Sequence, residues 1–574
     1  MEDKSDENRA DNLPPNATEF IRQVVREMGY HKKARQEVEA ELAAHFEDEL
    51  RNCTEAQEKE QKALRLIQEF GDAKLLAVLC RRGKKRCRPL WAKAMVWNSS
   101  AAAALMVLLT LYVGWFVRGK PSVRIDYLAL LNQMSRPQVA ERDNAWPFYE
   151  RAIALLISPN SDLQAIPAFE HPDYAEHRGF AGLSDDARRV ISQWLEANRI
   201  AWEDFVLAGS KPYVARSYQG KNDVNDPWLL SVRLPDLSAL RNLSRVGVWL
   251  SRRDVSQGRI AEALEDCLAV ARAGRHWQQS STIVEQLVAL AMARMAEEEI
   301  LHIVGRQRFS ATELADLQRQ VAALYPQRFP LVDTQSERLV FLDVVQHVFT
   351  DQGPGGGHVI PAATGGLLRQ EMHEDYGDVT ENQLLWTTLS IFHAGRDETL
   401  AKAEAIFDQQ KELSRLSPYE KRARQATTIS QTVTSLSRHR YALVRAMVPA
   451  LDRVMELGYR GRALHEATLT VLALQRYRQE KGAYPATLDE LKHAGYLADL
   501  PPDPYSDKPL SYKAAGSSFI LYSLGPDFHD DGGESGRNQE GRPKAWADKG
   551  DTVFWPVVGA NDYSPVLELP AARP

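Results

Sequence analysis

The sequence predicts a multidomain, mainly α-helical protein: a helical bundle, one transmembrane helix, a larger α-helical domain and a C-terminal α+β domain. Three observations support this prediction. One long segment is apolar and uncharged, apolar residues elsewhere recur mostly at helical spacing, and two short segments near the C-terminus have the alternating pattern of β-strands. The chain has 574 residues, which exceeds one ordinary core, so about three or four units are expected.

The apolar segment is Ala94–Val117, and it contains no charged residue. As a helix rising about 1.5 Å per residue it would span about 36 Å, enough to cross a hydrocarbon core of about 30 Å. Trp97 lies near one end and Tyr112, Trp115 and Phe116 lie near the other, as expected of aromatic residues at membrane interfaces. The alternative is a buried helix of a soluble domain. We expect a transmembrane helix.

Basic residues are unevenly distributed around this segment. Only Arg118 and Lys120 follow it closely, whereas the region before it, including a basic juxtamembrane segment at residues 83–93, is rich in them: Arg81, Arg82, Lys84, Lys85, Arg86, Arg88 and Lys93. The positive-inside rule therefore predicts a single-pass protein with a cytoplasmic N-terminus and an extracytoplasmic C-terminal part. Beside a membrane helix, the basic run favours lipid head groups over nucleic acid. We expect the membrane as a partner and no nucleic acid.

Composition and cysteine placement exclude several classes of protein. Charged residues make up 26% of the chain and the net charge is −6, which describes soluble domains around one membrane helix rather than a multi-span transporter. The cysteines are Cys53, Cys80, Cys87 and Cys267, and only Cys267 follows the membrane segment. The external part therefore has no disulfide framework, and the chain has no C-x-x-C signature of a redox or zinc site.

The part before the membrane segment predicts a disordered tail, residues 1–17, and a cytoplasmic helical bundle, residues 18–82. The tail is polar and acidic, whereas Val38, Leu42 and Phe46 begin an apolar helical stripe. The stretches EVEAELAAHFEDEL and ALRLIQEFGDAKLLA resemble the HAAS or permease-prefix domain, which precedes membrane segments in many bacterial proteins. This resemblance implies a protein-interaction role without chemistry, and it places the chain in a bacterial inner (cytoplasmic) membrane.

Residues 121–450 predict the extracytoplasmic α-helical domain, and one stretch in it offers a candidate site. In SERLVFLDVVQHVFTDQG, Asp343 and His347 are four residues apart and share a helix face, the geometry of a metal-ligand pair or an acid–base couple. Glu337 and Asp351 flank them. The alternative is the polar face of an amphipathic helix. No H-E-x-x-H, G-x-S-x-G, Rossmann or kinase signature is present.

Residues 451–560 predict the α+β domain, followed by a tail at 561–574. An apolar helix ends at Lys481-Gly482. The segments LSYKAA and FILYSL, separated by Ala515-Gly516, predict a β-hairpin, and Thr552–Trp555 predicts one more strand.

This domain resembles the globular head of the major pseudopilin of type II secretion systems, in which a long helix packs on a small antiparallel sheet. The matching residues are Ala473-Leu474, Tyr477-Arg478, Gly482, Tyr484-Pro485, Leu488, Leu491, Asp503-Pro504-Tyr505, Pro509-Leu510, Tyr512 and Tyr522-Ser523-Leu524-Gly525. Secretion pseudopilins carry a processing site directly before an N-terminal membrane helix. No such site precedes the membrane segment here, so a processed filament subunit is not expected.

The resemblance also implies a calcium site, because the family's loop after Y-S-L-G binds calcium. By residue match, the ligands would be the Leu524 carbonyl oxygen, Asp527 and Asp551. The same loop offers further hard oxygen donors of the type that calcium prefers, at Asp530, Asp531 and Asp548. The alternative is a simple acidic turn.

From these observations we expect a non-catalytic, membrane-anchored scaffold or interaction protein of the cell envelope. Its expected partners are envelope or secretion proteins and a cytoplasmic regulator, and calcium is the one cofactor that the sequence suggests. A metal-dependent enzyme in the helical domain and a transmembrane signalling protein are the alternatives.

Overall fold

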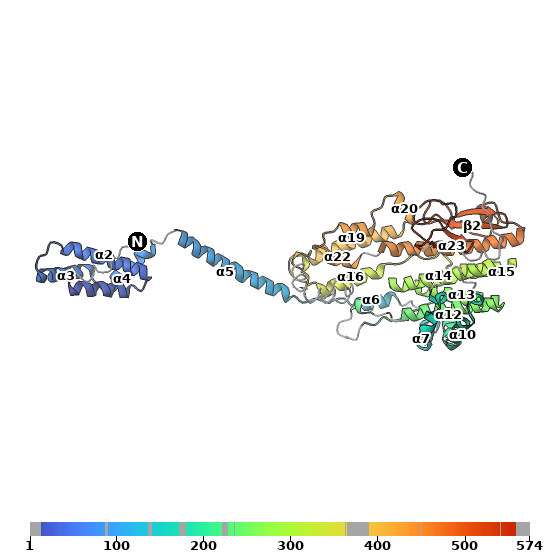
Figure 1. Cartoon of the computed structure of the whole chain (residues 1–574), viewed down its shortest axis with the longest axis horizontal. Helices are drawn as coiled ribbons and strands as arrows, with labels where there is room; N and C mark the ends of the chain where they lie inside the picture. The colour runs from blue at the N-terminus through green and yellow to red at the C-terminus, as the bar shows by residue number, and fades with distance from the viewer. Residues whose placement is uncertain are drawn as a thin grey trace. The chain divides into compact units, whose positions relative to one another are not determined.

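The computed structural model describes residues 13–86, 90–135, 140–170, 179–220, 228–232, 234, 236–361, 363, 390–448, 451–539 and 541–557. Figure 1 shows that the chain is mainly helical. Among the residues just given, the strands form one small sheet of three strands. The contacts divide the chain into two units, Met1–Trp115 and Phe116–Pro574, and each is considered by itself.

The first unit contains a bundle of four helices, α1 (Pro15–Glu27), α2 (Lys32–Leu50), α3 (Ala56–Phe70) and α4 (Ala73–Arg86). Its core includes the rings of Phe20, Phe46 and Phe70, whose centroids lie 5.7–6.4 Å apart. Helix α1 begins at Pro15, inside the segment predicted as a tail, because proline is well suited to the first helical position. Residues 1–12 of that tail lie outside the described residues.

Helix α5 (Leu90–Val117) contains the segment Ala94–Val117, which is long and apolar enough to cross a membrane. Large apolar side chains along it are exposed, including Leu105, Leu108 and Leu111 at 68%, 63% and 66%. A run of such side chains is unfavourable in water, because transfer of each one to an apolar environment would lower the free energy by about 1.5–3 kcal/mol. The prediction of an apolar helix of membrane-spanning length at Ala94–Val117 is therefore confirmed.

The second unit contains the remaining helices of the described chain. In chain order they are α6 (Tyr127–Met134), η2 (Glu141–Asp143), α7 (Trp146–Leu155), α8 (Ser161–Gln164), α9 (Pro167–Glu170), η3 (Phe180–Gly182), α10 (Asp185–Ala197), α11 (Arg199–Gly209), η4 (Leu229–Ser231), α12 (Asp236–Ser256), α13 (Ile260–Gln278), α14 (Ile283–Arg306), α15 (Ala311–Leu324), α16 (Gln335–Val348), η5 (Pro354–Gly356), α19 (Arg396–Ser414), α20 (Pro418–Ala423), α21 (Ile429–Ser435), α22 (Ala442–Met447), α23 (Leu451–Lys481) and α24 (Leu488–His493).

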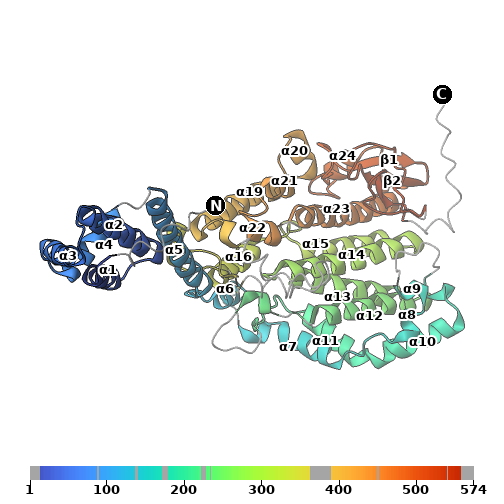
Figure 2. The ribbon, with the colours of Figure 1, turned by 60° about the vertical axis from the view of Figure 1, so that its left-hand side comes forward.

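Helices α12, α13 and α14 pack side by side, as Figure 2 shows, and form the centre of this unit. Helices α11, α12 and α14 all pack on α13, and the side chain of Trp277 on α13 is completely buried between them. The same core includes Trp202 from α11 and Trp249 from α12. These bulky rings fix the spacing between the helices.

The sheet consists of β1 (Ser511–Ala515), β2 (Ser518–Ser523) and β3 (Thr552–Trp555), in the order β1-β2-β3 with antiparallel pairing. The register pairs Tyr512 with Leu521, and the tight turn between β1 and β2 contains Gly516 at a φ of +58°. Glycine adopts this left-handed conformation without a steric penalty. The predicted hairpin and third strand are confirmed.

The sheet does not have a core of its own. Phe519 and Leu521 lie in one buried cluster with Cys267 of α13, Ile300 of α14 and Leu317 of α15. Helix α23 packs along α14 and α15 and also contacts β2 and β3. The sequence predicts a domain boundary between residues 450 and 451. In the structure, the residues on both sides of it belong to one unit. Helix α23 accounts for this, because its first part packs in the core around α12 to α14 and its second part packs in the cluster beneath the sheet. Residues 558–574, including the predicted tail, lie outside the described residues.

Candidate functional site

The acidic loop that carries the predicted calcium ligands runs from Leu524 to Asp551 and connects β2 to β3. Its start is fixed by the buried carboxylate of Asp503, which accepts hydrogen bonds from the Ser523 hydroxyl at 2.6 Å and from the Leu524 backbone N–H at 3.0 Å. This anchoring holds the Y-S-L-G turn against the preceding loop.

Asp551 lies at the end of this loop and is 1% exposed. One carboxylate oxygen, Oδ2, accepts a hydrogen bond from the Gly533 backbone N–H at 2.6 Å. The other, Oδ1, is buried and has no hydrogen-bond partner among the described residues. Burial, together with the negative charges of Asp530 and Asp531, raises the pKa of Asp551 to about 6. A buried acceptor without a partner is rare, and a bound cation would satisfy it.

Three other carboxylates of the loop have partners within it. Asp527 accepts from the backbone N–H of His529 at 3.1 Å and of Gly550 at 2.9 Å. Asp530 accepts from the Gly532 backbone N–H at 2.9 Å, and also from the Tyr522 hydroxyl of β2 at 2.8 Å. Asp531 Oδ1 lies 3.1 Å from His529 Nδ1.

These hydrogen bonds close the loop on itself. Asp548 is exposed. In the part of the chain that the structure describes, no group of three His, Cys, Asp or Glu side chains is arranged to hold a metal. A calcium site therefore remains a prediction, and the unpartnered oxygen of Asp551 is the structural feature that favours it.

Helix α20 packs against the acidic loop. Arg422 Nη1 donates to the Asp527 carbonyl oxygen at 3.1 Å, and its guanidinium lies 4.4 Å from the centre of the Phe528 ring. The Tyr419 backbone N–H donates to the Pro504 carbonyl oxygen at 3.0 Å. A groove of about 820 Å³ lies here, lined by aromatic and charged side chains that include Tyr512 and Lys508.

The four residues of the alternative site lie on α16 and just after it. Asp343 and His347 are brought together, with 3.5 Å between Asp343 Oδ1 and His347 Nδ1, and both are buried. Their surroundings are those of packed side chains. Asp343 Oδ2 accepts a hydrogen bond from the Leu229 backbone N–H at 2.7 Å, and the His347 ring stacks on Trp228 with centroids 4.9 Å apart.

Asp351 has a different partner, and Glu337 lies at the other end of the helix. Asp351 forms an ion pair with Arg124 at 2.5 Å. Glu337 is in the first turn of α16, where burial raises its pKa. The structure therefore joins Asp343 to His347 and directs Asp351 toward the chain at the end of α5.

The last residues of α5 and the chain directly after it, Phe116 to Ile125, are held by α16 and by the loop that follows α16, residues 349–358. Gln346 accepts hydrogen bonds from the backbone N–H groups of Arg124 and Ile125, each at 3.2 Å, and donates to the Ile125 carbonyl oxygen at 2.8 Å. Asp343 in turn accepts a hydrogen bond from Gln346 at 3.0 Å. Asp343 therefore orients the Gln346 side chain, which holds the backbone of Arg124 and Ile125 by hydrogen bonds.

The beginning of the segment is held by His358. The ring of Phe116 stacks on His358 with centroids 4.5 Å apart, and His358 Nε2 lies 3.1 Å from the Phe116 carbonyl oxygen. A side chain at Gly119 would come within 2.7 Å of Thr350, so the close approach of this backbone requires glycine.

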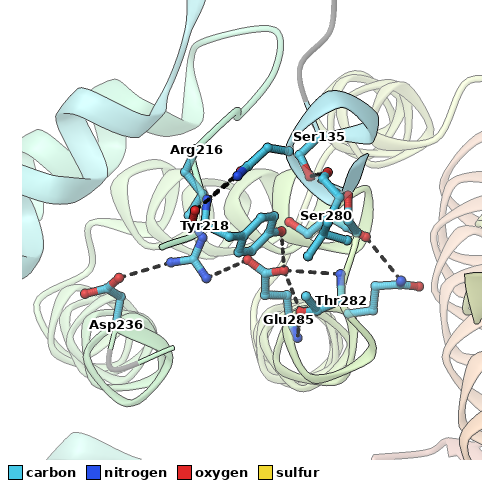
Figure 3. Close-up of polar contacts among 11 residues, drawn as sticks. Ser135, Arg216, Tyr218, Asp236, Ser280, Thr282 and Glu285 are labelled. Atoms are coloured by element: carbon cyan, nitrogen blue, oxygen red, sulfur yellow. Dashed lines mark hydrogen bonds and ion pairs between the residues drawn. The ribbon is translucent and has the colours of Figure 1, made fainter. Parts of the chain in front are cut away.

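The second unit contains a buried ionic cluster that was not predicted from the sequence. Figure 3 shows Arg216 between Asp236 and Glu285, at 3.0 Å and 2.7 Å. Glu285 is completely buried and also accepts a hydrogen bond from the Tyr218 hydroxyl at 2.7 Å. The capping pattern of Thr282 and Glu285 at the start of α14 was visible in the sequence. No local pattern pointed to Arg216.

Aromatic rings surround the guanidinium of Arg216. Its central carbon lies 5.1 Å from the ring of Trp277 and 5.3 Å from the rings of Trp146 and Tyr218. A guanidinium over aromatic faces is stabilised further when it is removed from water. The cluster joins the segment around Arg216 to α7, α12, α13 and α14, and its interior position indicates a structural role.

The fold and these sites define a mainly helical protein, and the described part of the chain has one helix that is long and apolar enough to cross a membrane. No protein-family model matches the chain, and no match was found among curated proteins or solved structures.

Proposed function

We propose that this chain is a non-catalytic, membrane-anchored scaffold of the bacterial cell envelope. In this proposal, α5 crosses the inner membrane, the bundle of α1 to α4 is a cytoplasmic interaction domain of the HAAS type, and the larger unit lies outside. The C-terminal sheet serves as a pseudopilin-like interaction head. The groove beside it favours such a role, since concave surfaces with aromatic and charged side chains are typical of binding sites.

One observation carries the scaffold proposal. The polar residues that the sequence offers for catalysis are used to fasten the segment after α5: Asp343 orients Gln346, Gln346 binds Ile125, and Asp351 pairs with Arg124. In this proposal these side chains hold the chain that enters the second unit, which supports a structural role for them over a catalytic one.

Metal analysis of the purified full chain tests this proposal against the enzymatic alternative. We expect no stoichiometric transition metal. A transition metal that co-purifies with the chain and is lost in His347→Asn, but not in the control His439→Asn on an exposed turn, would overturn the scaffold proposal. Because His347 stacks on Trp228, tryptophan fluorescence must first show that His347→Asn is folded.

Calcium is expected to stabilise the head. At a calcium concentration 100 times its Kd, binding to the folded state alone would add about 2.7 kcal/mol. We expect calcium to raise the Tm of the full chain and Asp551→Asn to abolish this increase. Asp507→Asn, outside the acidic loop, is the control. A Tm that calcium does not change would leave the loop as a simple acidic turn.

The calcium effect should depend on pH with a defined sign. The folded-state pKa of Asp551, about 6, lies above the ordinary value of 3.8, so its contribution to stability falls as the pH rises between these values. Calcium needs the ionised carboxylate and competes with the proton. The calcium-induced increase in Tm should therefore be large at about pH 7.5 and mostly lost at about pH 5. An equal increase at both values would contradict a role for Asp551.

A further inference from the structure

Helix α4 carries an apolar strip on the side that faces away from the bundle core. Ala73 and Ala77 pack into the core at 6% and 0% exposure, whereas Leu75, Val78 and Leu79 are 63%, 45% and 54% exposed. At about 100° per residue, these three side chains fall on the helix face opposite the two alanines. The described part of the first unit leaves this face uncovered.

A basic stripe borders the apolar strip. Lys74, Arg81 and Lys85 are exposed and fall within about 40° of one another around the helix, next to Val78. The helix, AKLLAVLCRRGKKR, contains no acidic residue. Lys84 points the other way and pairs with the bundle's own Glu37 and Glu41. The outer side of α4 thus combines exposed apolar groups with unbalanced positive charge.

The chain connection keeps the end of α4 close to the membrane that α5 would cross. Helix α4 ends at Arg86, α5 begins at Leu90, and the apolar span begins at Ala94. The four Cα–Cα steps from Arg86 to Leu90 span at most about 14 Å, and the helical turn from Leu90 to Ala94 adds about 6 Å. The last turn of α4 is therefore within about 20 Å of the hydrocarbon boundary, and the head-group layer fills about 5–8 Å of that distance.

We propose that α4 lies against the anionic phospholipid surface of this membrane. Leu75, Val78 and Leu79 insert into the interface, and the basic stripe contacts lipid phosphates. The inference rests on the proposed membrane crossing by α5 and adds a second lipid contact. Interfacial binding of this kind requires both an apolar face and complementary charge, and α4 supplies both.

Spin-label accessibility in the full chain tests this proposal. The chain is reconstituted as single copies in nanodiscs that contain phosphatidylglycerol, or phosphatidylcholine alone. Labels are placed by Val78→Cys and by the control Leu64→Cys on α3, whose native side chains are 45% and 46% exposed. Cys80 and Cys87 are replaced by serine, while Cys53 and Cys267 are buried and remain.

In anionic nanodiscs, we expect the label at residue 78 to become several-fold less accessible to a water-soluble nickel complex and more accessible to oxygen. The label at residue 64 should stay water-accessible. Replacing Lys74, Arg81 and Lys85 with glutamine should return residue 78 to water.

Three results would overturn the proposal. In the first, the nickel complex reaches the label at residue 78 as readily as the label at residue 64. In the second, the label at residue 78 is shielded from the nickel complex equally well in uncharged nanodiscs. In the third, it is shielded only when each disc holds two copies, which would identify a second chain as the occupant. A label introduced by Leu108→Cys in α5 separates this failure from failure of the membrane crossing, because it must lie in lipid whenever α5 spans the disc.

Discussion

Arg216→Ala is expected to destabilise the second unit by about 3–5 kcal/mol, because it leaves the carboxylate of Glu285 buried without its positive partner. Glu285 is 0% exposed, and Arg216 is its ion-pair partner at 2.7 Å. The loss can be measured by urea unfolding of the full chain, followed by tryptophan fluorescence. Every tryptophan of the chain follows residue 90, so this signal does not report on the bundle.

Arg151→Ala is the matched control, since it removes an arginine that pairs with Asp204 at the surface, where Arg151 is 54% exposed. Exposed ion pairs contribute about 0–1 kcal/mol. The double variant Arg216→Met with Glu285→Gln should recover much of the loss, because it removes both buried charges together. Equal losses for Arg216→Ala and Arg151→Ala would show that the buried cluster does not depend on charge pairing.

The parts of the fold with a local sequence pattern could be predicted. The apolar span needs only 24 consecutive residues without charge, and the hairpin needs two alternating segments around Gly516. The arrangement of helices could not be predicted in the same way. Helical spacing shows that Cys267 and Ile300 face a core, but it does not show that Phe519 lies in that core. For this reason the residues on both sides of the boundary predicted at residue 450 share one unit of contacts.

The candidate sites show the same limit. A spacing of four residues correctly places Asp343 beside His347, at 3.5 Å. Whether that pair faces solvent, a substrate or another segment depends on Trp228 and Leu229, which cover it from a distant part of the sequence. The Arg216 cluster was not predicted because its members come from separate elements and follow no shared motif.

Gly247→Ala is expected to destabilise the second unit by about 1–3 kcal/mol through overpacking. Gly247 lies in the middle of α12, where α11 and α13 approach it. A Cβ atom there would overlap the ring of Trp202 and come within 2.7 Å of Val270 Cγ2. Trp202 cannot move aside easily, because it is stacked on Phe205 and donates a hydrogen bond to Asp266 at 3.2 Å. Val270 is a short, β-branched and fully buried side chain. Relief would require the helices to separate.

Gly209→Ala provides the control for this close approach. Gly209 is also buried and ends α11, but a Cβ atom there would meet the Ala269 carbonyl oxygen and Arg272 Cβ at 3.5 Å, an ordinary contact distance. Because alanine restricts the unfolded chain more than glycine does, Gly209→Ala should leave the free energy of unfolding unchanged or raise it by up to about 1 kcal/mol, so the urea midpoint should not fall. If Gly247→Ala also left the midpoint unchanged, the result would show that α11 and α13 leave enough space beside Gly247 for a methyl group, contrary to the distances given above. A fall with Gly247→Ala alone would locate the close helix contact at Gly247, since both substitutions add the same methyl group.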